Sequence, residues 1–111
     1  TIGAVAEAVT LCEKAGADPI KMIRALTGGW ADSKILQTHG LRMIKKDFSP
    51  KGKTSTQLKD MNNILDCANN SNLHLPISTL VKEMYNNLVK NGHGNEDHSS
   101  LYNEIKKINE K

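Results

Sequence analysis

The side chain best suited to chemistry in this sequence is Lys59, within the segment TSTQLKDMNNILDCA at residues 54–68. Apolar residues recur there at spacings of three and four, which predicts an amphipathic helix with one face in the core. They are Leu58, Met61, Leu65 and Ala68, with Ile64 beside them. Lys59 falls about 100° around the helix from Leu58, on a polar stripe with Ser55, Asn62, Asn63 and Asp66. A lysine at that edge can hold an anion; the alternative is a solvated lysine that only keeps the helix soluble.

The other residues that could carry chemistry form no pattern of a known kind of site. The four histidines stand at unrelated spacings, and none pairs with a cysteine or carboxylate at a zinc-type interval, so no metal site is expected. They are His39, His74, His93 and His98. The sequence has no glycine-rich phosphate loop, no G-x-S-x-G elbow and no H-E-x-x-H motif. If there is catalysis, this chain supplies only part of it.

The composition is mildly basic, with 15 lysines and arginines against 12 acidic residues among 111. The one local excess, from Arg42 to Lys53, could attract a phosphate or carboxylate. Aromatic residues make up only 4% of the chain, and no compact helix-turn-helix with a basic recognition helix occurs, so nucleic-acid binding is not expected. No apolar run of about 18 residues and no signal peptide occur, so we expect a cytoplasmic or mitochondrial-matrix protein without a membrane span.

Helical periodicity with helix-capping residues predicts an all-α, compact multi-helix domain covering residues 1–111, because no segment alternates long enough to form a strand. Asp18 is the expected cap of a second helix that starts at Pro19, and Asp97 the expected cap of the last one. Asp32 or Ser33 is expected to cap the helical piece that follows the Gly28-Gly29 turn. Gly40 is expected to divide two short helical pieces. The predicted helices cover residues 2–15, 19–27, 33–39, 41–46, 54–68, 76–91 and a last one built on Leu101, Ile105 and Ile108.

Three details bear on how the chain is used. Ile2 is already in helical register without a capping signal before it, so we expect a truncated first helix and a fragment of a longer protein. The turn Gly28-Gly29-Trp30 either packs Trp30 as an anchor between helices or brings a glycine backbone close to a ligand. Cys12 and Cys67 fall on apolar stripes and are expected to be buried thiols.

Several motifs, taken in order, resemble the C-terminal helical domain of one enzyme family. They are EAVTLCEKAGADP, GGWADSKIL, DFSP, QLKDMNNILDCA, LPI and GNEDHSSL. In this order and spacing they resemble the 3-hydroxyisobutyrate dehydrogenase or tartronate semialdehyde reductase family, the β-hydroxyacid dehydrogenases related to 6-phosphogluconate dehydrogenase. The resemblance covers essentially the whole chain and implies the helical fold of that domain.

What the resemblance implies about the site falls on a few positions. Lys59 would approach the bound NAD or NADP near the substrate, with Asp60 beside it to orient or cap. Gly52 stands where the family often has an aromatic residue near the nicotinamide, seven positions before the lysine. The catalytic lysine, the Rossmann glycine motif and the Ser-Gly-Gly segment would all lie upstream of Thr1, so no catalytic residue is expected in this chain.

Two hypotheses follow. The first is the C-terminal helical domain of an NAD(P)-dependent β-hydroxyacid dehydrogenase, an oxidoreductase acting on CH-OH. It would form one wall of the active cleft beside the N-terminal Rossmann domain of the same polypeptide, contact a small β-hydroxyacid and carry homo-oligomer contacts, and it would be inactive alone. The alternative is a free-standing helical protein-interaction module, docking an acidic partner through the Lys59 stripe and the basic loop.

Overall fold

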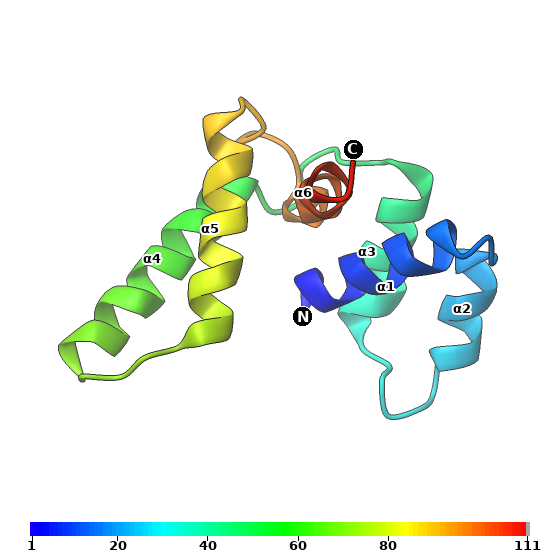
Figure 1. The fold of residues 1–111 in the computed structure, drawn as a ribbon, viewed down its shortest axis with the longest axis horizontal. Coiled ribbons are helices and arrows are strands. Elements are labelled where there is room, and N and C mark those ends of the chain that lie inside the picture. Colours follow the sequence, from blue (N-terminus) through cyan, green and yellow to red (C-terminus); the bar gives the residue numbers. More distant parts are fainter. Residues whose placement is uncertain (111) are drawn as a thin grey trace. The chain divides into compact units, whose positions relative to one another are not determined.

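A computed structural model describes residues 1–110 of the chain (Figure 1). Within that range the only regular elements are six α-helices and one short 3-10 helix, η1. In chain order they are α1 (Ile2–Lys14), α2 (Pro19–Leu26), α3 (Lys34–Lys45), α4 (Thr54–Asn70), α5 (Pro76–Lys90), η1 (His98–Ser100) and α6 (Leu101–Ile108). The only β-type pairing among these residues is an isolated bridge between Lys53 and Asp97. The all-helical prediction is therefore confirmed.

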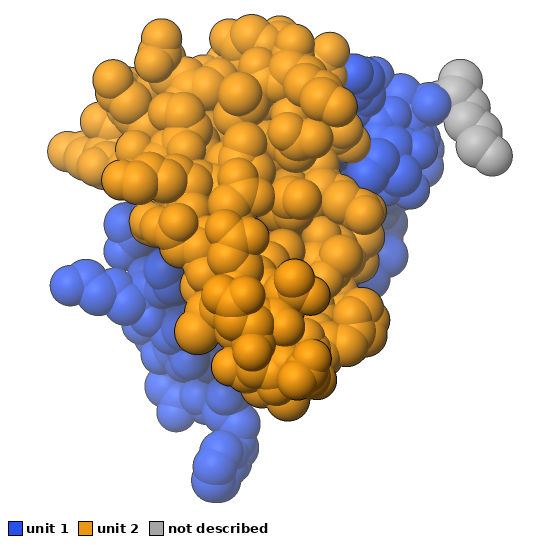
Figure 2. Space-filling model, turned by 90° about the vertical axis from the view of Figure 1, so that its left-hand side faces the viewer, with its two compact units in different colours: residues 1–48, 99–111 blue, residues 49–98 orange. Residues whose placement is uncertain are grey.

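The chain divides into two compact units, coloured separately in Figure 2. The first unit joins residues 1–48 to the described residues from Ser99 onward. Within it α1 packs against α2, α3 and α6, and its core is drawn from all four helices. The buried apolar side chains of this unit are Val5, Ala6, Val9, Ile23, Leu36, Met43, Leu101, Tyr102 and Ile105.

The second unit, Ser49–His98, is built on α4 and α5, which pack against each other. Met61 and Ala68 of α4 are buried, as are Met84, Tyr85 and Leu88 of α5. Leu58 and Leu65, also expected in the core, are half-buried. The apolar stripe of α4 therefore faces inward as predicted, although only part of it is fully covered.

Local capping signals set several helix boundaries as the sequence predicts. The Asp18 carboxylate accepts a hydrogen bond from the N–H of Ile20 at 2.9 Å, with Pro19 at the first helical position. Ser33, one of two candidates, caps α3 by accepting from the N–H of Leu36 at 2.8 Å. These caps need only residues two or three positions apart, which explains why the sequence alone reveals them.

The predicted break at Gly40 is wrong, because α3 runs unbroken from Lys34 to Lys45. Gly40 is buried, and a Cβ atom there would stand 3.0 Å from Cδ1 of Ile23 and 3.6 Å from Cγ1 of Val5. The glycine therefore lets α1, α2 and α3 approach closely. Its role is in packing and not in chain reversal.

The prediction that Asp97 caps the last helix is also wrong. The helix α6 follows η1, its first flanking residue is Ser100, and no side chain caps it. The carboxylate of Asp97 accepts hydrogen bonds from backbone N–H groups 45 and 46 positions earlier in the chain. A cap is a local pattern, and such a distant partner leaves no mark in the neighbouring sequence.

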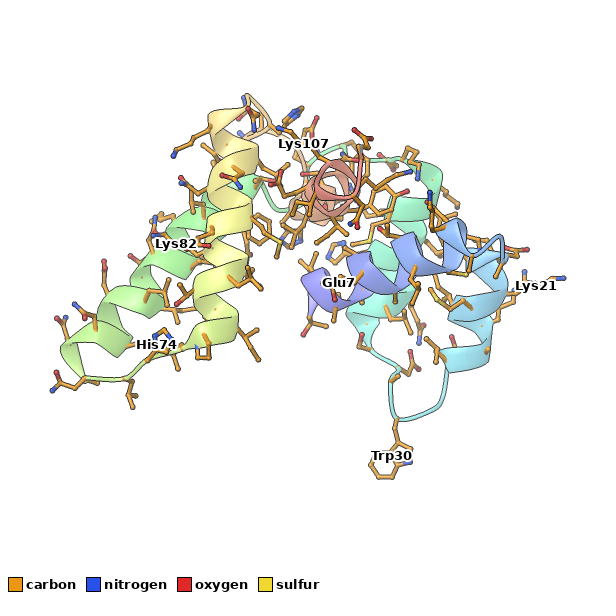
Figure 3. All side chains as sticks on the ribbon, in the orientation of Figure 1. Glu7, Lys21, Trp30, His74, Lys82 and Lys107 are labelled. Carbon is orange, nitrogen blue, oxygen red and sulfur yellow. The ribbon has the colours of Figure 1, made fainter. Side chains whose placement is uncertain are left out.

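Five side chains are more exposed than their apolar patterns predict. Trp30 is fully exposed at the tip of the turn between α2 and α3, so it is not a packing anchor in this chain (Figure 3). Cys67 is exposed and Cys12 half-buried, against the expectation of two buried thiols. Ile77 and Leu80, on the first turns of α5, are 79% and 57% exposed. Helical periodicity identifies the apolar stripe of a helix, but it does not show which part of that stripe another helix covers.

Candidate functional site

The candidate site begins with α4, which has no side-chain cap at its N-terminus. Backbone carbonyls of the loop after α5 accept hydrogen bonds from the first N–H groups of the helix in place of a capping side chain. The N–H of Thr54 donates to the carbonyl of Glu96 at 2.8 Å, and the N–H of Ser55 donates to that of Gly94 at 3.0 Å. The first N–H groups of a helix otherwise lack partners, so this loop fixes where α4 starts.

Lys59 lies on the solvent-exposed face of α4, together with Ser55, Asn63 and Asp66; Asn62 at its margin is half-buried. Among the described residues Lys59 forms no ion pair and no side-chain hydrogen bond. Its ammonium group is therefore available to an anion that approaches this face. The expected polar stripe is present, and the stripe is open to solvent within this chain.

The two other candidate residues differ in their surroundings. Asp60 is exposed next to Lys59. Gly52 is half-buried, and its backbone is already engaged: its N–H donates to Oδ1 of Asp97 at 3.1 Å, and its carbonyl accepts from the N–H of His98 at 2.7 Å. A Cβ at Gly52 would stand 3.1 Å from Cε1 of His98, so the imidazole fills the space beside the glycine.

A second polar cluster lies in the first unit, around the phenol of Tyr102. Its hydroxyl donates to Oε2 of Glu13 at 2.7 Å and accepts from the ammonium group of Lys46. Lys106 lies 3.7 Å from the same carboxylate, and the ring of Phe48 stacks on that of Tyr102. Burial, followed by the hydrogen bond and the charge of Glu13, raises the pKa of Tyr102. These contacts join α6 to α1 and to the end of α3.

The turn between α2 and α3 is the remaining feature with an open surface. The carboxylate of Asp32 accepts from the N–H of Gly28 at 2.8 Å and from the side-chain amide of Gln37 at 2.9 Å. These hydrogen bonds lower the pKa of Asp32. Gly28, Gly29 and Trp30 line a shallow depression there. The turn is thus held in one shape while its indole points into solvent.

Sequence reasoning missed Asp97 and Tyr102 as residues that organise the structure. Both are fully buried, and their side chains form hydrogen bonds with residues 45 to 89 positions away in the chain. No local pattern marks such pairs. The sequence singled out Asp97 as a helix cap and within the motif GNEDHSSL, but not as a partner of the loop that precedes α4.

Comparison with solved structures defines the class of fold. A crystal structure of 3-hydroxyisobutyrate dehydrogenase from Salmonella typhimurium matches 92% of this chain with a TM-score of 0.86. This chain covers 36% of that protein, and the two are 24% identical, so the match shows a shared helical fold and nothing more. The fold is that of the helical part of a larger dehydrogenase.

Sequence comparison then identifies the family. Residues 1–105 match the family described as NAD-binding of NADP-dependent 3-hydroxyisobutyrate dehydrogenase, and the chain belongs to that family. It is 44% identical over 100 residues to 2-hydroxy-3-oxopropionate reductase of Escherichia coli, and 30% identical over 100 residues to L-threonate dehydrogenase of Cupriavidus necator. The chain spans 34% of the length of each. The family resemblance noted in the sequence is confirmed.

Proposed function

We propose that this chain is the C-terminal helical domain, residues 1–111, of an NAD(P)-dependent β-hydroxyacid dehydrogenase, in which Lys59 contacts the dinucleotide. The family match and the names of the two relatives support this proposal, because both named enzymes are oxidoreductases of short hydroxy or oxo acids. The observation that carries it is the position of Lys59 on an exposed polar face, without an acidic partner among the described residues.

The residues of this face fit a dinucleotide. A lysine ammonium is a compact cation with three donors that binds phosphate or carboxylate as a point charge. Ser55 and Asn63 share the exposed face and add neutral hydrogen-bonding groups. A bound nicotinamide would supply hydride transfer. Lys59 would hold a negatively charged or polar part of the cofactor by charge and hydrogen bonding, with Asp60 orienting the ligand and Gly52 close by.

The proposal assigns the rest of the reaction to other parts of the enzyme. An N-terminal Rossmann domain of the same polypeptide would bind most of the cofactor, and a lysine outside this chain would transfer the hydroxyl proton of a small β-hydroxyacid. This chain alone would then be inactive. No described helix is both long and apolar enough to span a bilayer; we propose the cytoplasm, or a mitochondrial matrix, as the compartment.

Contact with further protein is part of the same proposal. Leu73, Ile77 and Leu80 in the second unit are each more than half exposed. Large exposed apolar side chains close together in sequence are typical of surfaces that other protein covers. They fit a domain with neighbours, either the Rossmann domain or a second subunit. Sedimentation of the complete enzyme would show whether it forms an oligomer.

The test of the proposed function is the variant Lys59→Ala in the polypeptide that contains the Rossmann domain. We expect the KM for NAD(P) to rise about tenfold, equivalent to a loss of about 1.4 kcal/mol of binding free energy. The melting temperature should stay nearly unchanged because Lys59 is exposed. Lys21→Ala, an exposed lysine of α2 (Figure 3), is the control and should not alter KM. A lowered melting temperature with unchanged kinetics would make Lys59 a structural residue and contradict the proposal.

A further inference from the structure

Asp97 is a fully buried carboxylate that binds the loop before α4. Its Oδ1 atom accepts two hydrogen bonds from backbone N–H groups, those of Lys51 at 2.9 Å and Gly52 at 3.1 Å. These consecutive residues belong to the loop that leads into α4. A buried charge is costly unless hydrogen bonds compensate for its lost hydration. The two amides provide such compensation, and in return the carboxylate holds the loop in place.

The backbone around Asp97 holds the first residues of α4 as well. The carbonyl of Asp97 accepts from the hydroxyl of Thr54 at 3.2 Å, and Asp97 pairs with Lys53 in the isolated bridge. The carbonyl of Glu96 accepts from the N–H of Thr54. Asp97 and its neighbour therefore contact the four residues from Lys51 to Thr54 in succession.

The same loop is also attached to α5. The hydroxyl of Tyr85, a buried residue of α5, donates to the carbonyl of His98 at 3.0 Å. The N–H of His98 donates to the carbonyl of Gly52 at 2.7 Å. Burial and the charge of Asp97 both raise the pKa of Tyr85 and keep its hydroxyl protonated as a donor. The start of α4 is thus tied to the body of α5 through the residues on either side of Asp97.

We propose that Asp97 is a positioning residue for Lys59. Lys59 lies in the second turn of α4, only five positions beyond Thr54, so the direction in which the helix leaves the clamped loop determines where the ammonium group stands. A displacement of about 1 Å in a binding group can cost two orders of magnitude in rate. This inference rests on the proposed contact between Lys59 and the dinucleotide. It adds that this contact depends on a carboxylate that does not itself touch the cofactor.

The experiment is a double-mutant cycle in the complete dehydrogenase, with Asp97→Ala, Lys59→Ala and the double variant. We expect Asp97→Ala to raise the KM for NAD(P) about tenfold, and to raise it less than about twofold further when Lys59 is already alanine. Asp97→Asn keeps an acceptor oxygen at the same position and should restore most of the affinity. Hydrogen exchange should accelerate at the amides of Lys51 and Gly52 in Asp97→Ala. Glu83→Ala, an exposed acidic residue of α5, should change neither measurement.

The outcomes separate this inference from the proposed function. If Lys59→Ala raises KM and Asp97→Ala multiplies that increase in full, Asp97 acts independently of Lys59 and the inference is wrong. If the amides of Lys51 and Gly52 exchange faster while KM stays unchanged, the clamp has no role in positioning. If Lys59→Ala alone leaves KM unchanged, the proposed function fails, and this inference fails with it. Should Asp97→Ala not fold, Asp97→Asn carries the test, with a twofold to threefold rise in KM, about 0.5 kcal/mol, that disappears in the Lys59→Ala background.

Discussion

Replacing Tyr102 by phenylalanine removes one hydroxyl and leaves the buried ring in place. That hydroxyl donates to the carboxylate of Glu13 at 2.7 Å and accepts from Lys46, so it connects α6 to α1 and to the end of α3. A hydrogen bond to a charged group contributes about 1.5 to 3 kcal/mol. The Glu13 side chain is 25% exposed, so water can partly replace the lost donor. We therefore expect Tyr102→Phe to lower the free energy of unfolding by about 1 to 2 kcal/mol near pH 7.

This loss should depend on pH. Burial acts to raise the pKa of Glu13, but the hydrogen bond from Tyr102 and the charges of Lys46 and Lys106 outweigh it, and the net pKa lies below the usual 4.5. A carboxylate with a lowered pKa in the folded state stabilises the protein above its unfolded-state pKa, and this stabilisation disappears as pH falls through the folded-state value. Tyr102→Phe removes part of the cause of the lowered pKa. The stability gap between the two proteins should therefore narrow from neutral pH to about pH 3.5.

Urea unfolding followed by far-UV circular dichroism, at both pH values, measures this gap. Tyr85→Phe is the matched control, because its hydroxyl donates at 3.0 Å to the uncharged backbone carbonyl of His98. It should cost about 0.5 to 1.5 kcal/mol, with little change over the same pH range. The reasoning would be refuted by a loss below about 0.3 kcal/mol for Tyr102→Phe at neutral pH, or by a gap of equal size at both pH values.

Three further predictions concern packing. Gly40→Ala should change the free energy of unfolding by less than about 1 kcal/mol, because the gain in helix propensity offsets a Cβ that would stand 3.0 Å from the flexible tip of Ile23. Gly40→Leu should lower it by about 2 to 3 kcal/mol, and equal free energies of unfolding for the two variants would contradict close packing at Gly40. Met61→Ala, on the buried face of α4, should lower the free energy of unfolding by about 2 to 4 kcal/mol, whereas Ile64→Ala, at a position 47% exposed, should lower it by less than about 1 kcal/mol. If urea unfolding gave the reverse order, the assignment of the buried face of α4 would be wrong. Trp30→Ala should leave the melting temperature of this chain nearly unchanged because the indole is fully exposed. A drop of several degrees would show that the indole packs against the rest of the chain.

The sequence predicted the helix that carries Lys59 but not the contacts of Asp97. The amphipathic pattern of residues 54–68 correctly predicted a helix with Lys59 on its exposed face. The role of Asp97 was not foreseeable, because a carboxylate close before an apolar run has the same local signature whether it caps the next helix or reaches back to an earlier loop. The identity of the family came from motif resemblance, and sequence comparison confirmed it. Contact between Lys59 and a dinucleotide stays a prediction.

The sequence by itself determined the features that depend on neighbouring residues: the helical class, the cap at Asp18, and the exposed polar face of α4. These follow from a period of about 3.6 residues and from hydrogen bonds that span two or three positions. The tertiary structure alone decided what Gly40, Asp97 and Tyr102 do. Their partners are distant in the chain, and only the packed helices bring a glycine against Ile23, a carboxylate against two loop amides, and a phenol against Glu13.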